Sequence, residues 1–247
     1  MAGHSKWKNI RLHKGKTDVV RAKLFGKLSR EITIAAKMGG GITDANPRLR
    51  LAVDKAKSGS MPADNIKRAI QKGTGELEGA DYEEIVYEGY GPGGVAVLVE
   101  SATDNRNRTV ADLRHLFSRF GGNLGESGSV AWQFARTGVL TVAAENKSED
   151  EVMEAALEAG ADDLSNDGEY FEITCAPESL QAIREALETR GIEVESAEAE
   201  MVAQNKVAPD AEQTRMLLKL LDALDDHDDV QRVASNAEIN DEAFIES

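Results

Sequence analysis

The chain has 247 residues, enough for two or three small domains, and its 41% hydrophobic and 30% charged content is ordinary for a globular protein. No apolar run approaches the roughly 18 residues of a membrane span, and no apolar signal segment follows the basic start, so we expect a cytoplasmic protein without a membrane partner. One cysteine allows no internal disulfide, and four scattered histidines lack zinc-site spacing, so we expect neither a metal nor another cofactor.

The formal net charge of −15 hides two parts of opposite sign. Residues 1–75 contain 17 Lys/Arg and 5 Asp/Glu, whereas residues 76–247 contain 12 Lys/Arg and 39 Asp/Glu. Such charge asymmetry suggests that the basic part meets a polyanion. We therefore expect the N-terminal part to bind nucleic acid, and the acidic remainder to limit nonspecific wrapping or to meet a protein or ribosome partner.

The first 17 residues are expected to form an arm without regular structure, because they hold five Lys/Arg, few large apolar groups and no acidic residue. A lone tryptophan among lysines could stack on a base, although a solvated terminus is the simpler alternative. The candidate nucleic-acid contacts in this arm are Lys6, Trp7, Lys8, Arg11, His13, Lys14 and Lys16.

A helix is expected from Asp18 to Met38, where three glycines end it. Its cations recur every seven residues, so they form one stripe that drifts only about 20° per step. Charged helix faces are usually just solvated, but a stripe of one sign is better tolerated when a polyanion neutralises it. The candidate contacts on this helix are Lys23, Lys27, Arg30 and Lys37.

Two more short helices are expected, at 47–58 and from about 62 to 72. Asn46-Pro47 is typical of an N-cap followed by proline at the first helical position, and Gly73 supplies a stop. Three short helices with small connectors predict a compact bundle with cations on more than one side. Arg48 and Arg50 are candidate nucleic-acid contacts on the second helix.

The stretch after an acidic linker at 76–84 is expected to begin with strands at 85–87 and 95–99. The glycines between them match GxGxxG, but a dinucleotide site needs a helix after the glycines, so a hairpin turn is expected here. Thr109 is expected to start a capped helix, and residues 130–134 another strand. Arg106 and Arg108 then either belong to a loop that caps this helix or form a second anion contact.

From Val139 the pattern is strand, helix, strand, strand, helix, strand, the order of a ferredoxin-like sandwich. Its later strands are expected at 162–165, 169–174 and 192–197. A last helix capped by Asp210 and a strand at 230–234 cannot bury their own faces, so they are expected to complete the central domain. The predicted class is α+β: a basic three-helix domain at 1–78, a central ferredoxin-like α/β domain at 79–136 plus 204–247, and a second one inserted at 137–203.

An enzyme is not expected, because no Ser-His-Asp or Cys-His arrangement is identifiable and Cys175 falls in a predicted strand. A purely structural interaction module is a further alternative, which the basic N-terminal part disfavours. No helix carries a convincing set of paired Asn, Gln and Arg base readers, so phosphate contacts are expected to dominate any binding.

The whole chain resembles the YebC/PmpR family. The motifs that carry the resemblance are Ala2-Gly3-His4-Ser5-Lys6-Trp7, Arg30-Glu31, Ala35-Ala36-Lys37, Asn46-Pro47-Arg48-Leu49-Arg50, Arg68-Ala69-Ile70, residues 87–94, residues 104–109, residues 121–124 and Gly128-Ser129-Val130-Ala131-Trp132. Two positions depart from the family pattern: Leu12-His13-Lys14 replaces His-Arg-Lys, and Ser60 replaces the asparagine before Met-Pro.

This resemblance implies a helical N-terminal domain with two α/β domains in a cytoplasmic regulator of gene expression, and no catalytic residues. Bacterial members are described as DNA-binding transcriptional regulators, which is the function we expect. The alternative is a ribosome-associated translation factor that binds ribosomal RNA and assists elongation, like relatives that include a mitochondrial translational activator of cytochrome c oxidase. DNA and ribosomal RNA both remain possible partners at this point, and the oligomeric state stays open.

Overall fold

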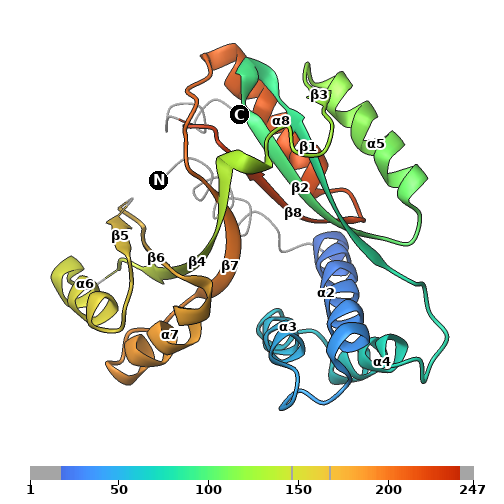
Figure 1. Cartoon of the computed structure of the whole chain (residues 1–247). Coiled ribbons are helices and arrows are strands. Elements are labelled where there is room, and N and C mark those ends of the chain that lie inside the picture. The colour runs from blue at the N-terminus through green and yellow to red at the C-terminus, as the bar shows by residue number, and fades with distance from the viewer. Residues whose placement is uncertain (1–17, 146, 167, 240–247) are drawn as a thin grey trace.

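The computed structural model describes residues 18–145, 147–166 and 168–239, and it has three parts (Figure 1). Helices α2 (Asp18–Gly39), α3 (Pro47–Ser58) and α4 (Ala63–Gly73) form the first part. Two four-stranded antiparallel sheets, each with two helices, form the others. The predicted α+β class, with a helical N-terminal part and two α/β sandwiches, is confirmed.

The residue that caps α3 also joins this helix to α2. Asn46 accepts a hydrogen bond from the Leu49 backbone N–H at 3.1 Å and donates to the carbonyls of Ala35 and Gly40 at 2.8 and 2.9 Å. One side chain therefore caps α3 and holds the end of α2 against it. Helix α4 packs so closely on α2 that a Cβ added at Gly73 would lie 2.3 Å from the Thr33 carbonyl oxygen, so this position requires glycine.

The first sheet has the strand order β3-β1-β2-β8 and is covered on one face by α5 (Arg106–Arg119) and α8 (Ala211–Asp225). Its strands are β1 (Glu83–Tyr90), β2 (Ala96–Thr103), β3 (Asn123–Leu124) and β8 (Val230–Ser235). The glycine-rich turn joins β1 to β2 as an antiparallel hairpin through the 3-10 turn η1 (Pro92–Gly94), as predicted.

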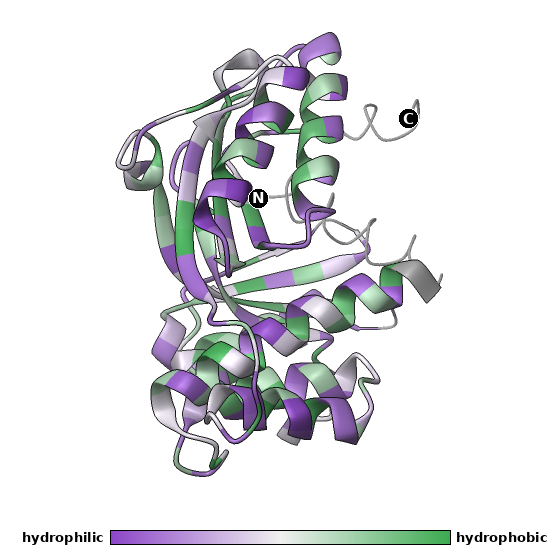
Figure 2. Ribbon diagram, turned by 90° about the vertical axis from the view of Figure 1, so that its right-hand side faces the viewer, coloured by the Kyte–Doolittle hydropathy of each residue, from purple (hydrophilic) through white to green (hydrophobic). Residues whose placement is uncertain are grey.

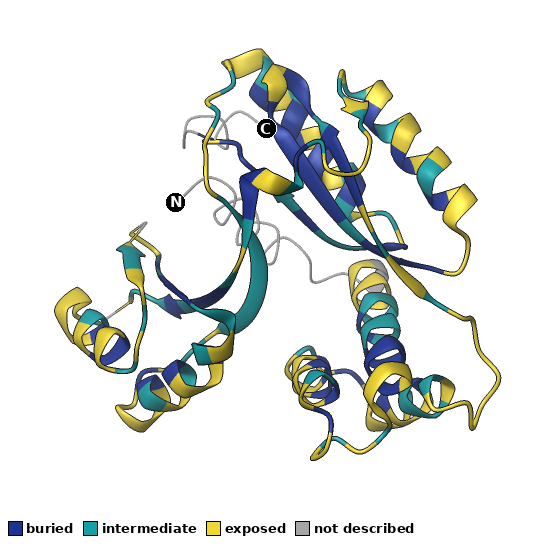
Figure 3. Cartoon of the chain, in the orientation of Figure 1, coloured by how far each residue is buried: buried dark blue, intermediate teal, exposed yellow. Residues whose placement is uncertain are grey.

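Strand β2 is buried on both faces, which makes it the centre of this part (Figure 3). Val97 and Val99 pack with α5 and α8, for example against Phe117, whereas Leu98 faces the opposite side and packs with Phe134. Because β8 pairs with β2, the last helix and strand of the chain complete this sheet, although more than 100 residues separate the two strands. The sequence predicted this return because that helix and strand could not bury their own apolar faces.

The second sheet has the order β5-β6-β4-β7, which is the ferredoxin-like order, with α6 (Glu149–Glu158) and α7 (Leu180–Thr189) against it. Its strands are β4 (Phe134–Ala143), β5 (Asp163–Asn166), β6 (Tyr170–Cys175) and β7 (Ser196–Ala203), and the 3-10 turn η3 (Pro177–Ser179) precedes α7. Figure 2 shows apolar positions alternating with polar ones along the helices, as expected for helices that cover a core on one side. The thiol of Cys175 is buried here, and burial raises its pKa, which opposes a nucleophilic role.

Two predicted elements near the first sheet are wrong. The helix expected to start at Thr109 begins three residues earlier, because the Asn105 side chain caps it by accepting from the Arg108 N–H at 3.1 Å. Residues 131–133 form the 3-10 turn η2 (Ala131–Gln133), and β4 begins only at Phe134. The N–H groups of Val130 and Ala131 bond to the Glu88 carboxylate, and not to a neighbouring strand.

The strand expected at 192–197 is also displaced. Strand β7 begins at Ser196 and pairs along β4 up to Ala203 opposite Phe134. Ile192 instead packs in the core beside α7 and bonds back to the Leu187 carbonyl. Among the described residues, none of the helices has the length and apolar character needed to cross a bilayer.

Candidate nucleic-acid interface

Seven of the predicted contact residues lie outside the described part of the chain, and the others fall into a paired set and an exposed set. Those outside are Lys6, Trp7, Lys8, Arg11, His13, Lys14 and Lys16. The cations on α2 and α3 belong mostly to the paired set, because carboxylates from the acidic part of the chain contact them.

The cation stripe of α2 lies against the C-terminal end of α8 and the turn that leads to β8. Lys23 Nζ lies 3.7 Å from Asp226 Oδ2, and Lys27 Nζ bonds to Asp225 through its carboxylate at 3.0 Å and its carbonyl at 2.6 Å. The side chains of Lys27 and Arg30 are each only 18% exposed. The cation stripe expected to meet a polyanion is therefore occupied, in this fold, by carboxylates of the same chain.

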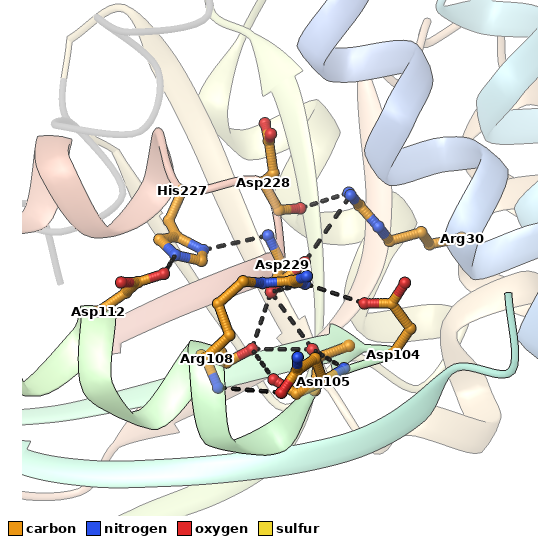
Figure 4. Close-up of polar contacts among 10 residues, drawn as sticks. Arg30, Asp104, Asn105, Arg108, Asp112, His227, Asp228 and Asp229 are labelled. Atoms are coloured by element: carbon orange, nitrogen blue, oxygen red, sulfur yellow. Dashed lines mark hydrogen bonds and ion pairs between the residues drawn. The ribbon is translucent and has the colours of Figure 1, made fainter.

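Asp229 is the buried centre of this contact, as Figure 4 shows. Its side chain is 4% exposed, and Oδ2 accepts from Arg108 and the Thr109 hydroxyl at 2.8 Å each and from the Thr103 hydroxyl at 3.2 Å. Arg30 Nη2 lies 3.8 Å from Oδ1. Burial opposes ionisation of Asp229, but the hydrogen bonds from Arg108 and Thr109 outweigh it and lower the carboxyl pKa. The same bond to Asp229 raises the pKa of the Arg108 guanidinium.

The turn that carries Asp229 is fixed by His227. Its Nδ1 accepts from the Asp229 backbone N–H at 3.1 Å, while Nε2 lies 3.3 Å from Asp112 on α5. Arg30 also donates to the Asp228 carbonyl (Figure 4). Helix α2, helix α5 and the α8–β8 turn therefore meet at one polar cluster, which is a contact between parts of the chain rather than an open anion site.

The predicted nucleic-acid contacts at the other end of the helical part also bond to groups of the same chain. Lys37 pairs with Asp81 in the linker before β1. Arg48 bonds to Glu31 at 3.1 Å and to Glu84 at 3.0 Å, and the bond to Glu84 raises the guanidinium pKa. Arg50 has no carboxylate partner among the described residues, is exposed, and donates to loop carbonyls of Thr43 and Asp44.

Three exposed cations of the helical part that have no acidic partner within the described ranges lie on α4, besides Arg21 of α2 and Arg50 of α3. Lys67, Arg68 and Lys72 are exposed, and the described residues offer none of them an ion pair. The sequence pattern predicted that these three point outward. It did not identify them as nucleic-acid contacts, because they lack the seven-residue repeat of α2. Together with Arg50, they form what we call the α4 surface. Arg106, at the start of α5, is likewise exposed and has no ion-pair partner there.

A second feature that sequence reasoning missed is the loop before β4. The buried Glu88 carboxylate accepts from the backbone N–H groups of Gly128, Val130 and Ala131 at 2.6–2.7 Å. Burial opposes the charge of Glu88, but these three bonds outweigh it and lower the carboxyl pKa. The loop so fixed presents Trp132, which is 66% exposed. Across the described residues, no group of three or more His, Cys, Asp or Glu could hold a metal ion.

The fold and its charge division define a class: an α+β protein in which a basic helical bundle is held against two acidic α/β sandwiches. The model of the TACO1/YebC protein N-terminal domain matches residues 5–76, and that of the TACO1/YebC second and third domain matches residues 82–237. The chain therefore belongs to the TACO1/YebC family, and the resemblance seen in the sequence is confirmed.

Full-length relatives carry names that concern regulation. Proteins named probable transcriptional regulatory protein are 56% identical in Gemmatimonas aurantiaca, covering 100% of both chains, and 52% identical in Desulforapulum autotrophicum, covering 99% of both. The crystal structure of a conserved hypothetical protein from Aquifex aeolicus has a TM-score of 0.84 and 48% identity, over 91% of this chain and 93% of that one. The family is thus named for regulatory proteins and not for enzymes.

Proposed function

We propose that this protein is a cytoplasmic DNA-binding transcriptional regulator that holds the duplex through its N-terminal helical part. The observation that carries the proposal is the charge division, 17 Lys/Arg against 5 Asp/Glu in residues 1–75 and 12 against 39 in the remainder. The names of the full-length relatives support a role in transcription. The net negative charge of the sandwiches repels phosphate, so it favours binding of the duplex at the basic part.

The α4 surface is the expected first contact, because its four cations are exposed and have no described carboxylate to displace. Contact by the α2 stripe requires the duplex to replace Asp225, Asp226 and Asp229 as the partners of Lys23, Lys27 and Arg30. Phosphate contacts of this kind give affinity with little sequence information, so target choice has to come from elsewhere in the assembly.

The test is a titration of the full chain with labelled duplex DNA and with a ribosomal RNA fragment, at several salt concentrations. We expect duplex binding whose log affinity falls linearly with log salt. In the K67E/R68E/K72E variant, three lost phosphate contacts should reduce the slope by roughly 2.7. The control R184E/R190E/K206E makes the same charge change in the acidic part, where Arg190 and Lys206 are exposed and Arg184 is half-buried. Equal losses in both variants, or binding to the RNA alone, would overturn the proposal.

A further inference from the structure

The acidic part of the chain carries its few cations unevenly. Of the 12 Lys/Arg in residues 76–247, six lie on α5 and α8, the two helices that cover the first sheet. They are Arg106, Arg108, Arg114 and Arg119 on α5, and Arg215 and Lys219 on α8. At the average composition of this part, the 14 residues of α5 would contain about one cation and three acids, whereas α5 has four arginines and Asp112. Helix α5 is therefore a basic element inside an acidic region.

Most of the cations of α5 lie on its outer side, whereas Arg106, in the first turn, falls on the same side as Leu113 and Phe117. The side chains of Thr109, Leu113 and Phe117 are buried against the sheet. At about 100° per residue, Arg108, His115 and Arg119 fall within roughly 40° of one another on the opposite side, since they are seven and four residues apart. Figure 3 shows this side of α5 exposed at the edge of the molecule.

The cations of α5 beyond its first turns have no carboxylate to neutralise them within the described ranges. Arg114, His115 and Arg119 make no ion pair there, and Arg119 only lies over the ring of Phe120, 5.4 Å from its centroid. The acid of this helix, Asp112, lies 3.3 Å from the His227 ring. Asp112 falls on the same side, within about 60° of Arg108, His115 and Arg119, so this face mixes both signs but keeps an excess of cations.

The start of α5 lies close to the cations of α2, with aspartates between them. Arg108 at the start of α5 and Arg30 of α2 approach the same carboxylate, Asp229, from two sides (Figure 4). A duplex that reaches from α2 to α5 has to pass the aspartates of the α8–β8 turn, but it stays on the side of the first sheet. From Arg108 to Arg119 the helix rises about 16 Å, a length over which a duplex presents roughly ten phosphate charges.

We infer that the outer face of α5, which presents Arg114, His115 and Arg119, is a second phosphate-contact surface for double-stranded DNA. This inference rests on the proposed function and adds to it a contact inside the acidic part of the chain. It assigns to α5 the role of fixing how the duplex lies across the protein, because two separated contacts define a direction where one does not.

The experiment uses the full chain with the substitutions R114E/R119E, titrated with duplex DNA and with RNA over a range of salt. The control is R184E/R190E, at α7 and its C-cap, which makes the same charge change at two arginines of the second sandwich that pair with Glu188 and Glu158. We expect the α5 variant to lose at least tenfold in duplex affinity at low salt and to lower the salt slope by roughly 1.8. The control should lose less than threefold with an unchanged slope, and both should melt close to the wild type.

The outcomes separate the two proposals. If the α5 variant binds duplex like its control, while K67E/R68E/K72E still loses affinity, the inference about α5 is overturned and the proposed function stands. If the α5 variant loses only RNA binding, a DNA surface on α5 is excluded. If the wild-type chain does not bind duplex at all, both proposals fail.

Discussion

Helix α2 and helix α4 both carry rows of cations in the same basic bundle, yet they use them differently. On α2, carboxylates from the α8–β8 turn, 198 residues away for the Lys27–Asp225 pair, hold the cations. On α4, the cations are exposed and meet no described carboxylate. A stripe of positive charge in a sequence therefore marks a surface that needs an anion, but the anion can be another part of the same chain.

The largest expected effect comes from removing the acidic partner itself. Deleting residues 208–247 takes away α8 and β8, so the first sheet should lose its edge strand and much of its core, and its cooperative melt should disappear. Calorimetry of this truncation would test it. Replacing residues 137–203 by a short linker is the contrasting deletion, and it should leave the first sheet folded, because the chain ends to be joined lie on paired strands. A truncated chain that melts like the intact protein would contradict the proposed domain boundaries.

The next largest loss of stability is expected from substitutions in the cation stripe of α2. In K23E/K27E/R30E, three carboxylates would face Asp225, Asp226 and Asp229, and Asp229 would lose one partner while buried. We expect the free energy of unfolding to fall by about 3 kcal/mol, because breaking a partly buried ion pair leaves its partner uncompensated. Urea denaturation measures this. An unchanged midpoint would show that the contact between α2 and the α8–β8 turn contributes nothing to stability.

A single change at the centre of that contact should have a smaller effect. Asp229→Asn keeps an acceptor for Thr109 but removes the charge that Arg108 and Arg30 approach, so a loss of about 2 kcal/mol at pH 7 is expected. The folded-state pKa of Asp229 is lowered, so its stabilising effect is present above the unfolded pKa of about 3.9 and is lost as pH falls through the folded value.

The stabilities of wild type and the Asp229→Asn variant should therefore converge in acid. The same substitution at Asp226, whose side chain is 57% exposed, is the control and should cost less than about 0.5 kcal/mol. A constant difference between wild type and Asp229→Asn from pH 7 to pH 3 would rule out the ionised carboxylate as the stabilising group.

The smallest effect on stability is expected on α4. K67E/R68E/K72E should change the free energy of unfolding by less than about 0.5 kcal/mol, because these side chains are exposed and have no described ion pair to lose. Thermal melts of this variant and of K23E/K27E/R30E, measured side by side, sharpen the comparison between the two helices. Similar losses in both would mean that α4 also carries a structural contact.

Local signals predicted most of the fold. Asn46 before Pro47 gave α3 its start, and Asp210 with Gln213 forms the capping box that opens α8. The failures came where a distant group decided the local structure. Residues 130–134 have strand-like composition, but Glu88 takes their N–H groups and turns them into a 3-10 segment. Asn105 outcompeted Thr109 as a cap, and the Thr109 hydroxyl instead donates to Asp229.

The candidate site was less accessible from sequence. Periodicity correctly put Lys23, Lys27 and Arg30 on one side of a helix, but it carries no information about which part of the fold lies against that side. The pairing with the α8–β8 turn depends on β8 returning to β2, a tertiary event. The basic character of α5, in contrast, could have been predicted from the sequence, because this segment contains four arginines and one acidic residue, Asp112.

The aspartates of the α8–β8 turn also change how salt would act on this protein. If DNA takes up the α2 cations, it must first displace Asp225 and Asp226, so binding becomes an exchange of one anion for another. Added salt then weakens the internal contact as well as the contact with DNA. The counterions released at the phosphates are partly taken up again by the vacated aspartates. The protein would hold nucleic acid with a shallower dependence on ionic strength than its number of cations implies.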